Sequence, residues 1–206
     1  MLGLCVDWGG VNGKPNPEEL VLLGIKSYEK QDFSKARKYF EKACDLNNGG
    51  GCSGLGFLYG SGKGVEKDLI KAAYLYSKAC ELKEGDGCGA LGSLYEYGRG
   101  VEKDLTKASQ YFSKACDLNY KFGCSWLGAM QYQGKVVVKN EKQAMKKFEK
   151  ACKLGYKEVC EMVTYKGLCK LGHKEACEIF SLEVLCRLSD LKACGMSYDK
   201  RKALGF

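Results

Sequence analysis

Cysteine residues recur in pairs at one fixed interval along this chain of 206 residues. Twelve of the thirteen cysteines form pairs whose members lie eight positions apart, and Cys5 is left alone near the N-terminus. The pairs are Cys44 and Cys52, Cys80 and Cys88, Cys116 and Cys124, Cys152 and Cys160, Cys169 and Cys177, and Cys186 and Cys194. The fold must therefore repeat one local geometry at each of these places.

Three kinds of chemistry could use such pairs: metal binding, thiol catalysis and disulfide bonding. A zinc site usually draws its ligands from spacings such as C-x-x-C, whereas this chain has no C-x-x-C and a single histidine, His173. A catalytic thiolate needs a neighbouring base, and one histidine cannot serve six pairs. The pairs therefore predict disulfides in an oxidising compartment, and we expect no metal and no cofactor.

The sequence repeats with a period of 36 residues, because steps of that length from Cys44 reach Cys80, Cys116 and Cys152. The segment LGFLYGSGKGVEKDLIKAAYLYSKACEL, which starts at Leu55, aligns with LGSLYEYGRGVEKDLTKASQYFSKACDL, which starts at Leu91. Self-similarity at a period of this size indicates a solenoid, in which each unit buries its apolar face against its neighbours.

Each unit contains two helical patterns. Leu91, Leu94 and Tyr95 lie on one face of a short helix, here called helix A. Asp104 then stands at an N-cap position before the apolar stripe of a second helix, helix B. Helix A carries a glycine at the same place in three units, and helix B carries an alanine. We expect these small residues to let the two helices approach closely: Gly56, Gly92 and Gly128, with Ala72, Ala108 and Ala144.

The residues from Leu91 to Ala115 spell LG-x-x-Y-x-x-G-x-G-V-x-x-D-x-x-KA-x-x-Y-x-x-KA and closely resemble the Sel-one-like repeat, a relative of the tetratricopeptide repeat. The cysteines make the chain similar to the secreted, cysteine-rich Hcp-type proteins of bacteria, whose two cysteines per repeat form a disulfide. The resemblance covers about Pro17 to Cys160. It implies an all-α fold, an α/α superhelix of bridged repeats.

The chain departs from the repeat at both ends. We expect residues 1–16 to form a flexible tail, residues 17–160 the array of hairpins, and residues 161–206 shortened 17-residue units that continue the solenoid. The first hairpin lacks four residues of the usual turn. The C-terminal units predict one short helical segment each and a less regular stack.

Resemblance to tetratricopeptide arrays places one set of helix A positions on a concave surface. These positions differ between units, and their aromatic, hydroxyl and acidic side chains suit an extended peptide or a peptidoglycan fragment. The candidate groove residues are Ser53, Phe57, Asp86, Ser93, Glu96, Tyr97, Phe122, Ser125, Ala129, Tyr132 and Gln133.

Charge and hydropathy exclude other classes of partner. The net charge of +8 comes from 29 lysines and only four arginines, spread over every unit beside acidic residues, which argues against nucleic acid. No apolar run reaches the length of a membrane span. The first residues lack a functioning export signal, so we expect a secreted or periplasmic monomer whose natural leader is absent from this sequence.

The resemblance also implies penicillin binding and weak β-lactamase activity. The S-x-x-K element of serine β-lactamases occurs at Ser27, Ser189 and Ser197, but neither S-D-N nor K-T-G is present. No catalytic residues can be assigned, so we expect a binding scaffold, with slow β-lactam hydrolysis as the alternative. A secreted effector that binds host proteins is a second alternative.

Overall fold

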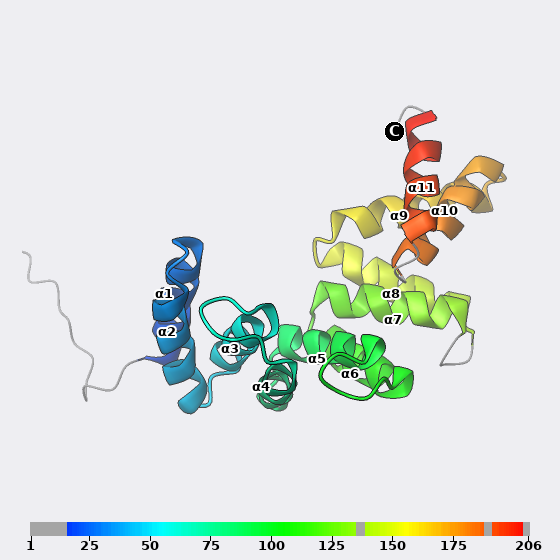
Figure 1. The fold of residues 1–206 in the computed structure, drawn as a ribbon. Helices are drawn as coiled ribbons and strands as arrows, with labels where there is room; N and C mark the ends of the chain where they lie inside the picture. Colours follow the sequence, from blue (N-terminus) through cyan, green and yellow to red (C-terminus); the bar gives the residue numbers. More distant parts are fainter. Residues whose placement is uncertain (1–15, 135–138, 188–190, 204–206) are drawn as a thin grey trace, which may run out of the picture.

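The computed structural model describes residues 16–134, 139–187 and 191–203, and the regular structure in these ranges is helical. The helices follow one another along a curved path from α1 to α11 (Figure 1). Their bounds are α1 Pro17–Glu29, α2 Phe33–Asp45, α3 Gly49–Ser61, α4 Leu69–Glu81, α5 Gly85–Tyr97, α6 Leu105–Asp117, α7 Lys121–Gln133, α8 Glu141–Lys153, α9 Lys157–Lys170, α10 Lys174–Arg187 and α11 Leu191–Ala203. The predicted all-α repeat fold is confirmed.

Short polar residues begin several of the helices, and glycines end several of them. Asp104 is the N-cap of α6, where its side chain accepts a hydrogen bond from the backbone N–H of Lys107 at 2.9 Å. Gly98 ends α5 in the left-handed conformation at φ 66°, which glycine adopts without a steric penalty. The same cap and glycine frame the long turn of the preceding hairpin, at Gly62 and Asp68.

Within a hairpin, the glycine of helix A lies against an aromatic ring of helix B. A Cβ atom at Gly92 would stand 2.9 Å from the ring of Phe112, and one at Gly128 would stand 2.8 Å from the ring of Phe148. The expected close approach is therefore confirmed. The atoms nearest to the glycine, however, belong to a ring four residues after the alanine that was expected to face it. The alanine, Ala108 or Ala144, contributes its backbone carbonyl oxygen to the contact.

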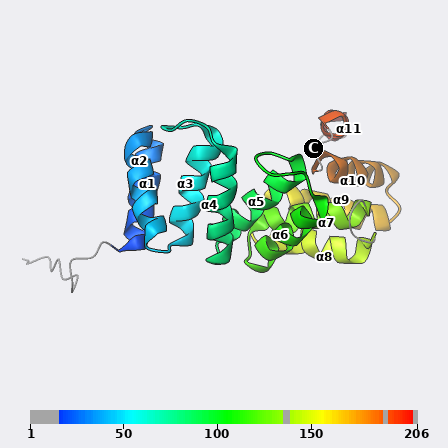
Figure 2. The same cartoon turned by 60° about the horizontal axis from the view of Figure 1, so that its bottom comes forward.

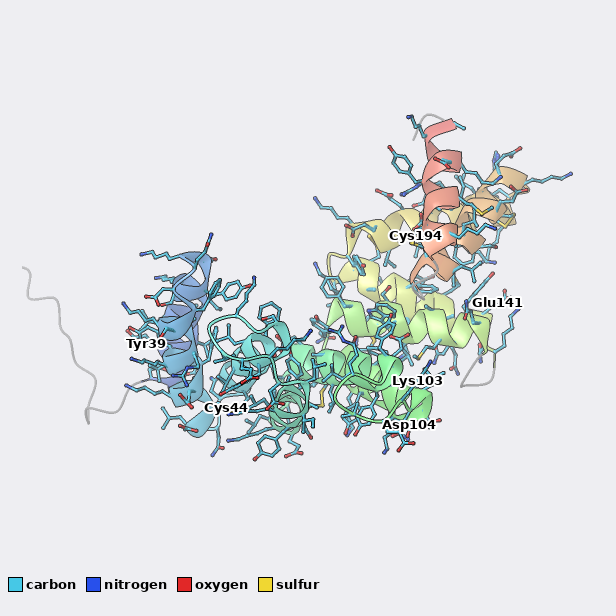
Figure 3. All side chains as sticks on the ribbon, viewed as in Figure 1. Tyr39, Cys44, Lys103, Asp104, Glu141 and Cys194 are labelled. Atoms are coloured by element: carbon cyan, nitrogen blue, oxygen red, sulfur yellow. A yellow bond between two sulfur atoms is a disulfide. The ribbon has the colours of Figure 1, made fainter. Side chains whose placement is uncertain are left out.

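Disulfides join each hairpin to the next. Cys80 lies in the last turn of α4 and Cys88 in the first turns of α5, with their Cα atoms 4.5 Å apart. All six predicted pairs are bonded. Figure 3 labels Cys44 of the first bridge and Cys194 of the last. A lysine adds a polar contact at two joints: Lys78 donates to the Cys44 carbonyl at 3.1 Å, and Lys150 to that of Cys116 at 2.7 Å.

The odd-numbered helices of the array form its inner row. Helices α1, α3, α5 and α7 each contact the next in the row, whereas α2, α4 and α6 contact one another less. Figure 2 shows α1 to α4 standing side by side. The inner helices thus lie closer to one another than the second helices of the hairpins do. The stack therefore curves toward the inner row, and its surface on that side is concave.

The C-terminal units differ from the expectation in one respect. Each unit is a single helix, but α9, α10 and α11 have 14, 14 and 13 residues and are as long as the helices of the array. The prediction of short helices is therefore wrong, because only residues 154–156 separate α8 from α9 and only residues 171–173 separate α9 from α10. Helix α10 also packs back against α7, through the Tyr132 and Phe180 rings, whose centroids are 5.3 Å apart.

Candidate ligand-binding groove

A cavity of about 290 Å³ opens on the inner side of the first three hairpins. Helices α1, α3 and α5 contribute Ile25, Ser53, Gly54, Asp86 and Ala90. The remaining lining residues are aromatic, and they are Tyr28, Phe40, Phe57, Tyr76 and Tyr120. The cavity therefore depends on the stacking of successive hairpins, because no single unit supplies its walls.

Glycines bring two of these rings close to the helix backbone. A Cβ atom at Gly54 would lie 2.7 Å from the Phe40 ring, and one at Gly89 would lie 2.6 Å from the Tyr120 ring. Tyr28 and Phe57 meet edge to face with their centroids 5.6 Å apart. The rings thus form apolar walls whose positions are fixed by contact with helix backbones and with one another.

Asp86 is the one carboxylate in this lining. It is the second residue of α5, where the helix dipole stabilises a negative charge. Its Oδ1 atom is buried and accepts no hydrogen bond. Within the described ranges, no lysine or arginine forms a salt bridge with Asp86. Apart from the helix N-terminus, the carboxylate therefore has no cationic salt-bridge partner in the described ranges.

The charge of Asp86 reaches the neighbouring titratable groups. Burial raises the pKa of Tyr120 to about 12, and the nearby Asp86 charge adds to the rise. Burial and the same charge also raise the pKa of Tyr76. The pKa of Glu84 is raised by burial first and by the Asp86 charge second. The two phenols are thus neutral at physiological pH and present rings and hydroxyl groups, not charges, to the cavity.

Three of the eleven sequence-predicted residues, Ser53, Phe57 and Asp86, line this cavity together. Phe57 is 46% exposed, so its ring is available to a ligand. Phe122 lies beyond the cavity beside Tyr120, and their ring centroids are 5.4 Å apart. Tyr97 is exposed at the end of α5, and Ser93 is partly buried one turn before it.

The other predicted residues are buried or partly buried. Ser125 and Ala129 are buried, and Ala129 belongs to a core cluster with Phe148. Glu96 is 8% exposed, and its Oε2 atom has no hydrogen-bond partner. Gln133 is partly buried with an unpaired Oε1 atom, and Tyr132 packs against Phe180 of α10.

Sequence reasoning missed most of the aromatic lining, because it considered helix A positions alone. Phe40 and Tyr76 come from helix B, and Tyr120 precedes α7 at its N-cap position. One signal was available in the sequence. Tyrosine is a poor N-cap residue, and Tyr120 makes no side-chain cap hydrogen bond, whereas Asn48 caps α3 in the same place two periods earlier in the array.

The S-x-x-K elements do not form serine-lysine pairs where the structure describes them. Ser197 is fully buried and donates its hydroxyl hydrogen to Glu183, while Lys200 pairs with Glu178. Ser27 donates to the carbonyl of Leu23 at 2.8 Å. Ser189 lies outside the described residues. Neither described serine therefore donates its hydroxyl hydrogen to the lysine of its own S-x-x-K element, the arrangement that would mark a serine β-lactamase.

Two features that bear on function are absent from the described residues. None of the helices there has the length and apolar character needed to span a bilayer. In the same ranges, no three His, Cys, Asp or Glu side chains converge as metal ligands. The lone cysteine, Cys5, and the predicted N-terminal tail lie outside the described residues, apart from Asn16, the N-cap of α1.

Stacked helical hairpins with a covalent joint between successive units define a helical-repeat scaffold, with its cavity on the inner row. The family model described as Sel1 repeat matches residues 21–48, 51–84, 85–120 and 122–156, well over half of the chain. The chain belongs to the Sel1 repeat family. The matches end at residue 156, so α9, α10 and α11 lie beyond them.

Curated relatives and solved structures agree with this assignment. The chain is 58% identical over 64 residues to HcpC of Helicobacter pylori, a match that covers 31% of this chain and 21% of HcpC. It is 53% identical over 58 residues to the Helicobacter pylori beta-lactamase HcpA, over 28% of this chain and 23% of HcpA. These matches therefore span only about a fifth of the curated relatives.

Among solved structures, Helicobacter pylori cysteine rich protein B is 46% identical, with a TM-score of 0.51, over 72% of this chain and 97% of that one. A Sel1 repeat protein from Oxalobacter formigenes is 26% identical with a TM-score of 0.65, over 69% of this chain and 59% of that one. The predicted similarity to cysteine-rich Hcp-type proteins is confirmed.

Proposed function

We propose that this protein is an exported scaffold that binds an extended peptide segment along its inner helix row. The observation that carries the proposal is the cavity of about 290 Å³, which three successive hairpins and the N-cap residue of α7 build from five aromatic rings and one carboxylate. Concave sites with mostly apolar walls and few polar groups are typical of ligand binding. The six disulfides support export, because such bonds persist in oxidising compartments.

A peptide fits the shape of this surface better than a compact ligand does. Beyond the cavity, aromatic rings continue along the inner row from Tyr120 through Phe122 to Tyr156, with neighbouring centroids 5.4 and 4.8 Å apart. A row of rings offers successive contacts to alternate side chains of an extended chain. The peptide stems of cell-wall fragments share this chemistry and form one arm of the test.

The proposal is tested with two matched variants of the oxidised protein. Ala90→Phe adds a ring inside the cavity, whereas Ala203→Phe adds the same ring to an exposed position on α11. Labelled peptide libraries and soluble muropeptides are titrated against each protein by fluorescence polarisation. We expect Ala90→Phe to weaken peptide binding and Ala203→Phe to leave it unchanged. Equal binding by both variants, or binding of neither ligand class by the parent protein, contradicts the proposal.

Slow β-lactam hydrolysis is the second candidate function, and the name of the relative HcpA favours it. The described serines of the S-x-x-K elements are engaged elsewhere, so any turnover would have to use other groups. Hydrolysis of a chromogenic cephalosporin by highly purified protein, abolished by one serine substitution, would favour this candidate. We expect no turnover that follows a single serine.

A further inference from the structure

The aromatic cavity is lined by a negatively charged residue, although the protein as a whole is positively charged. The chain carries a net charge of +8, yet the cavity lining contains Asp86 and no lysine or arginine. The Asp86 carboxylate has no salt-bridge partner in the described ranges, and its Oδ1 atom is buried without a hydrogen bond. An under-neutralised carboxylate beside aromatic faces is a site for a cation with an apolar stem.

Two aromatic rings, one in the cavity wall and one beyond the cavity, already make contacts with lysine ammonium groups of the protein itself. The Nζ atom of Lys63 lies 4.8 Å from the centroid of the Tyr28 ring. The Nζ atom of Lys121 lies 5.3 Å from the centroid of the Phe122 ring, beyond the other end of the cavity. These contacts show that the rings of this surface accept ammonium groups, and Tyr28 is itself a ring of the cavity wall. The cavity lining contains no lysine or arginine, so the side of the cavity at Asp86 is open to an ammonium group from a ligand.

We propose that the cavity holds a lysine side chain of an extended peptide, with the alkyl stem against the rings and the ammonium group at Asp86. The inference rests on the proposed function, because it names the part of the peptide that the groove recognises. A lysine fits better than an arginine, because a compact ammonium group at the end of a flexible stem can enter a small cavity that has one carboxylate. Phe57, exposed at the cavity wall, covers the stem.

The test measures binding of N-acetylated, C-amidated peptides by fluorescence polarisation, with lysine, norleucine, Nε-acetyl-lysine or glutamate at one scanned position. Norleucine keeps the apolar stem and removes the charge. We expect the parent protein to prefer lysine to norleucine by about tenfold or more, the combined effect of a charge-assisted hydrogen bond and cation–π contacts. Acetyl-lysine should bind as weakly as norleucine, and glutamate more weakly than either.

Two variants connect this preference to Asp86. Asp86→Asn keeps the shape and size of the side chain, and we expect it to abolish the preference for lysine while leaving norleucine binding unchanged. Asp117→Asn, an exposed position on α6, removes the same charge outside the cavity and should keep the preference. The coupling between peptide charge and Asp86 is thus read from a double-mutant cycle, which cancels any general effect of the substitution.

A second probe separates failure of the inference from failure of the proposed function. n-Butylammonium and n-butanol are titrated by NMR against the parent protein and Asp86→Asn. Shifts around the cavity with n-butylammonium that Asp86→Asn abolishes support the inference about the cavity, even if no peptide binds and the proposed function fails. Three results overturn the inference while the groove remains a peptide site. The first is that the parent protein binds peptides without preferring lysine, and the second is that Asp86→Asn keeps the preference. The third result is that binding requires a free peptide N-terminus.

Discussion

The hairpin array and the C-terminal units hold successive helices together in different ways. Between Cys44 and Cys152, one bridge follows another every 36 residues, or once for every two helices. From Cys152 to Cys186 the interval falls to 17 residues, or one bridge for every helix. The bridges are therefore densest where no helix hairpin of the repeat type is formed.

Glycines pack more closely in the array, where the bridges are sparser, than in the C-terminal units, where the bridges are denser. In the array, glycines such as Gly92 and Gly128 are in close contact with rings of the partner helix. In the C-terminal units, Gly167 and Gly195 have no atom within 4 Å of an added Cβ. A joint between helices can thus be fixed by interlocking small and aromatic residues or by a covalent bond, and the C-terminal units depend more on the bond.

Opening one bridge in each region should give the largest effects. The chain-entropy model assigns about 2.5 kcal/mol to a bridge that closes a loop of this length. For Cys169→Ala/Cys177→Ala we expect α10 and α11 to lose most of their amide protection. For Cys80→Ala/Cys88→Ala we expect a lower unfolding midpoint but persistent protection of α4 and α5, since Gly87 still packs closely against Ala79. Hydrogen exchange with mass analysis checks this, and equal local loss in both variants would contradict the comparison.

Two buried glutamates sharpen the same contrast. Glu96 in the array and Glu183 in α10 are each 8% exposed, but Glu183 lies 3.5 Å from Arg201 and accepts from Ser197, whereas Oε2 of Glu96 has no partner. Burial raises the pKa of Glu96 to about 7, against the partial opposing effect of the Lys103 charge. The folded state therefore retains a proton that the unfolded state loses, and stability falls as pH rises from about 4.5 to about 7.

We therefore expect Glu96→Gln to stabilise the oxidised protein at pH 8 by up to about 3 kcal/mol and to flatten its pH profile, measured by denaturant unfolding. Glu183→Gln should destabilise by roughly 1–3 kcal/mol, because it leaves buried polar partners unsatisfied. Glu102→Gln, in the exposed turn after α5, is the control and should change neither quantity. A profile for Glu96→Gln that retains the slope of the parent would exclude this carboxylate as its source.

Two glycine substitutions should have effects of opposite sign. Gly92→Ala places a methyl group 2.9 Å from the Phe112 ring, and we expect a loss of about 1–3 kcal/mol through overpacking. Gly167→Ala meets nothing within 4 Å, so the higher helix propensity of alanine should raise stability by up to about 1 kcal/mol. Thermal unfolding of the two variants gives the comparison directly. Stabilisation by both would show that the interlocking in the array is unimportant.

The repeat pattern predicted the fold well because periodicity, caps and cysteine spacing are local properties of the sequence. Asp104, the hairpin glycines and all six bridges were found in this way. The cavity was predicted only in part. Ser125 and Ala129 occupy the expected helix positions but are covered by neighbouring helices, and the rings of Phe40 and Tyr76 arrive from the second helix of each hairpin. Such contacts depend on the angle between units, which a one-dimensional pattern does not contain.

The most direct test of the account is a count of free thiols in protein recovered from an oxidising compartment. Alkylation under denaturing conditions without reductant should label one cysteine, Cys5, and reduction should then expose all thirteen. Peptide mapping should join only cysteines eight positions apart. Several labelled cysteines among the six pairs, or bonds between different pairs, would contradict the covalent joints on which the curvature and the cavity depend.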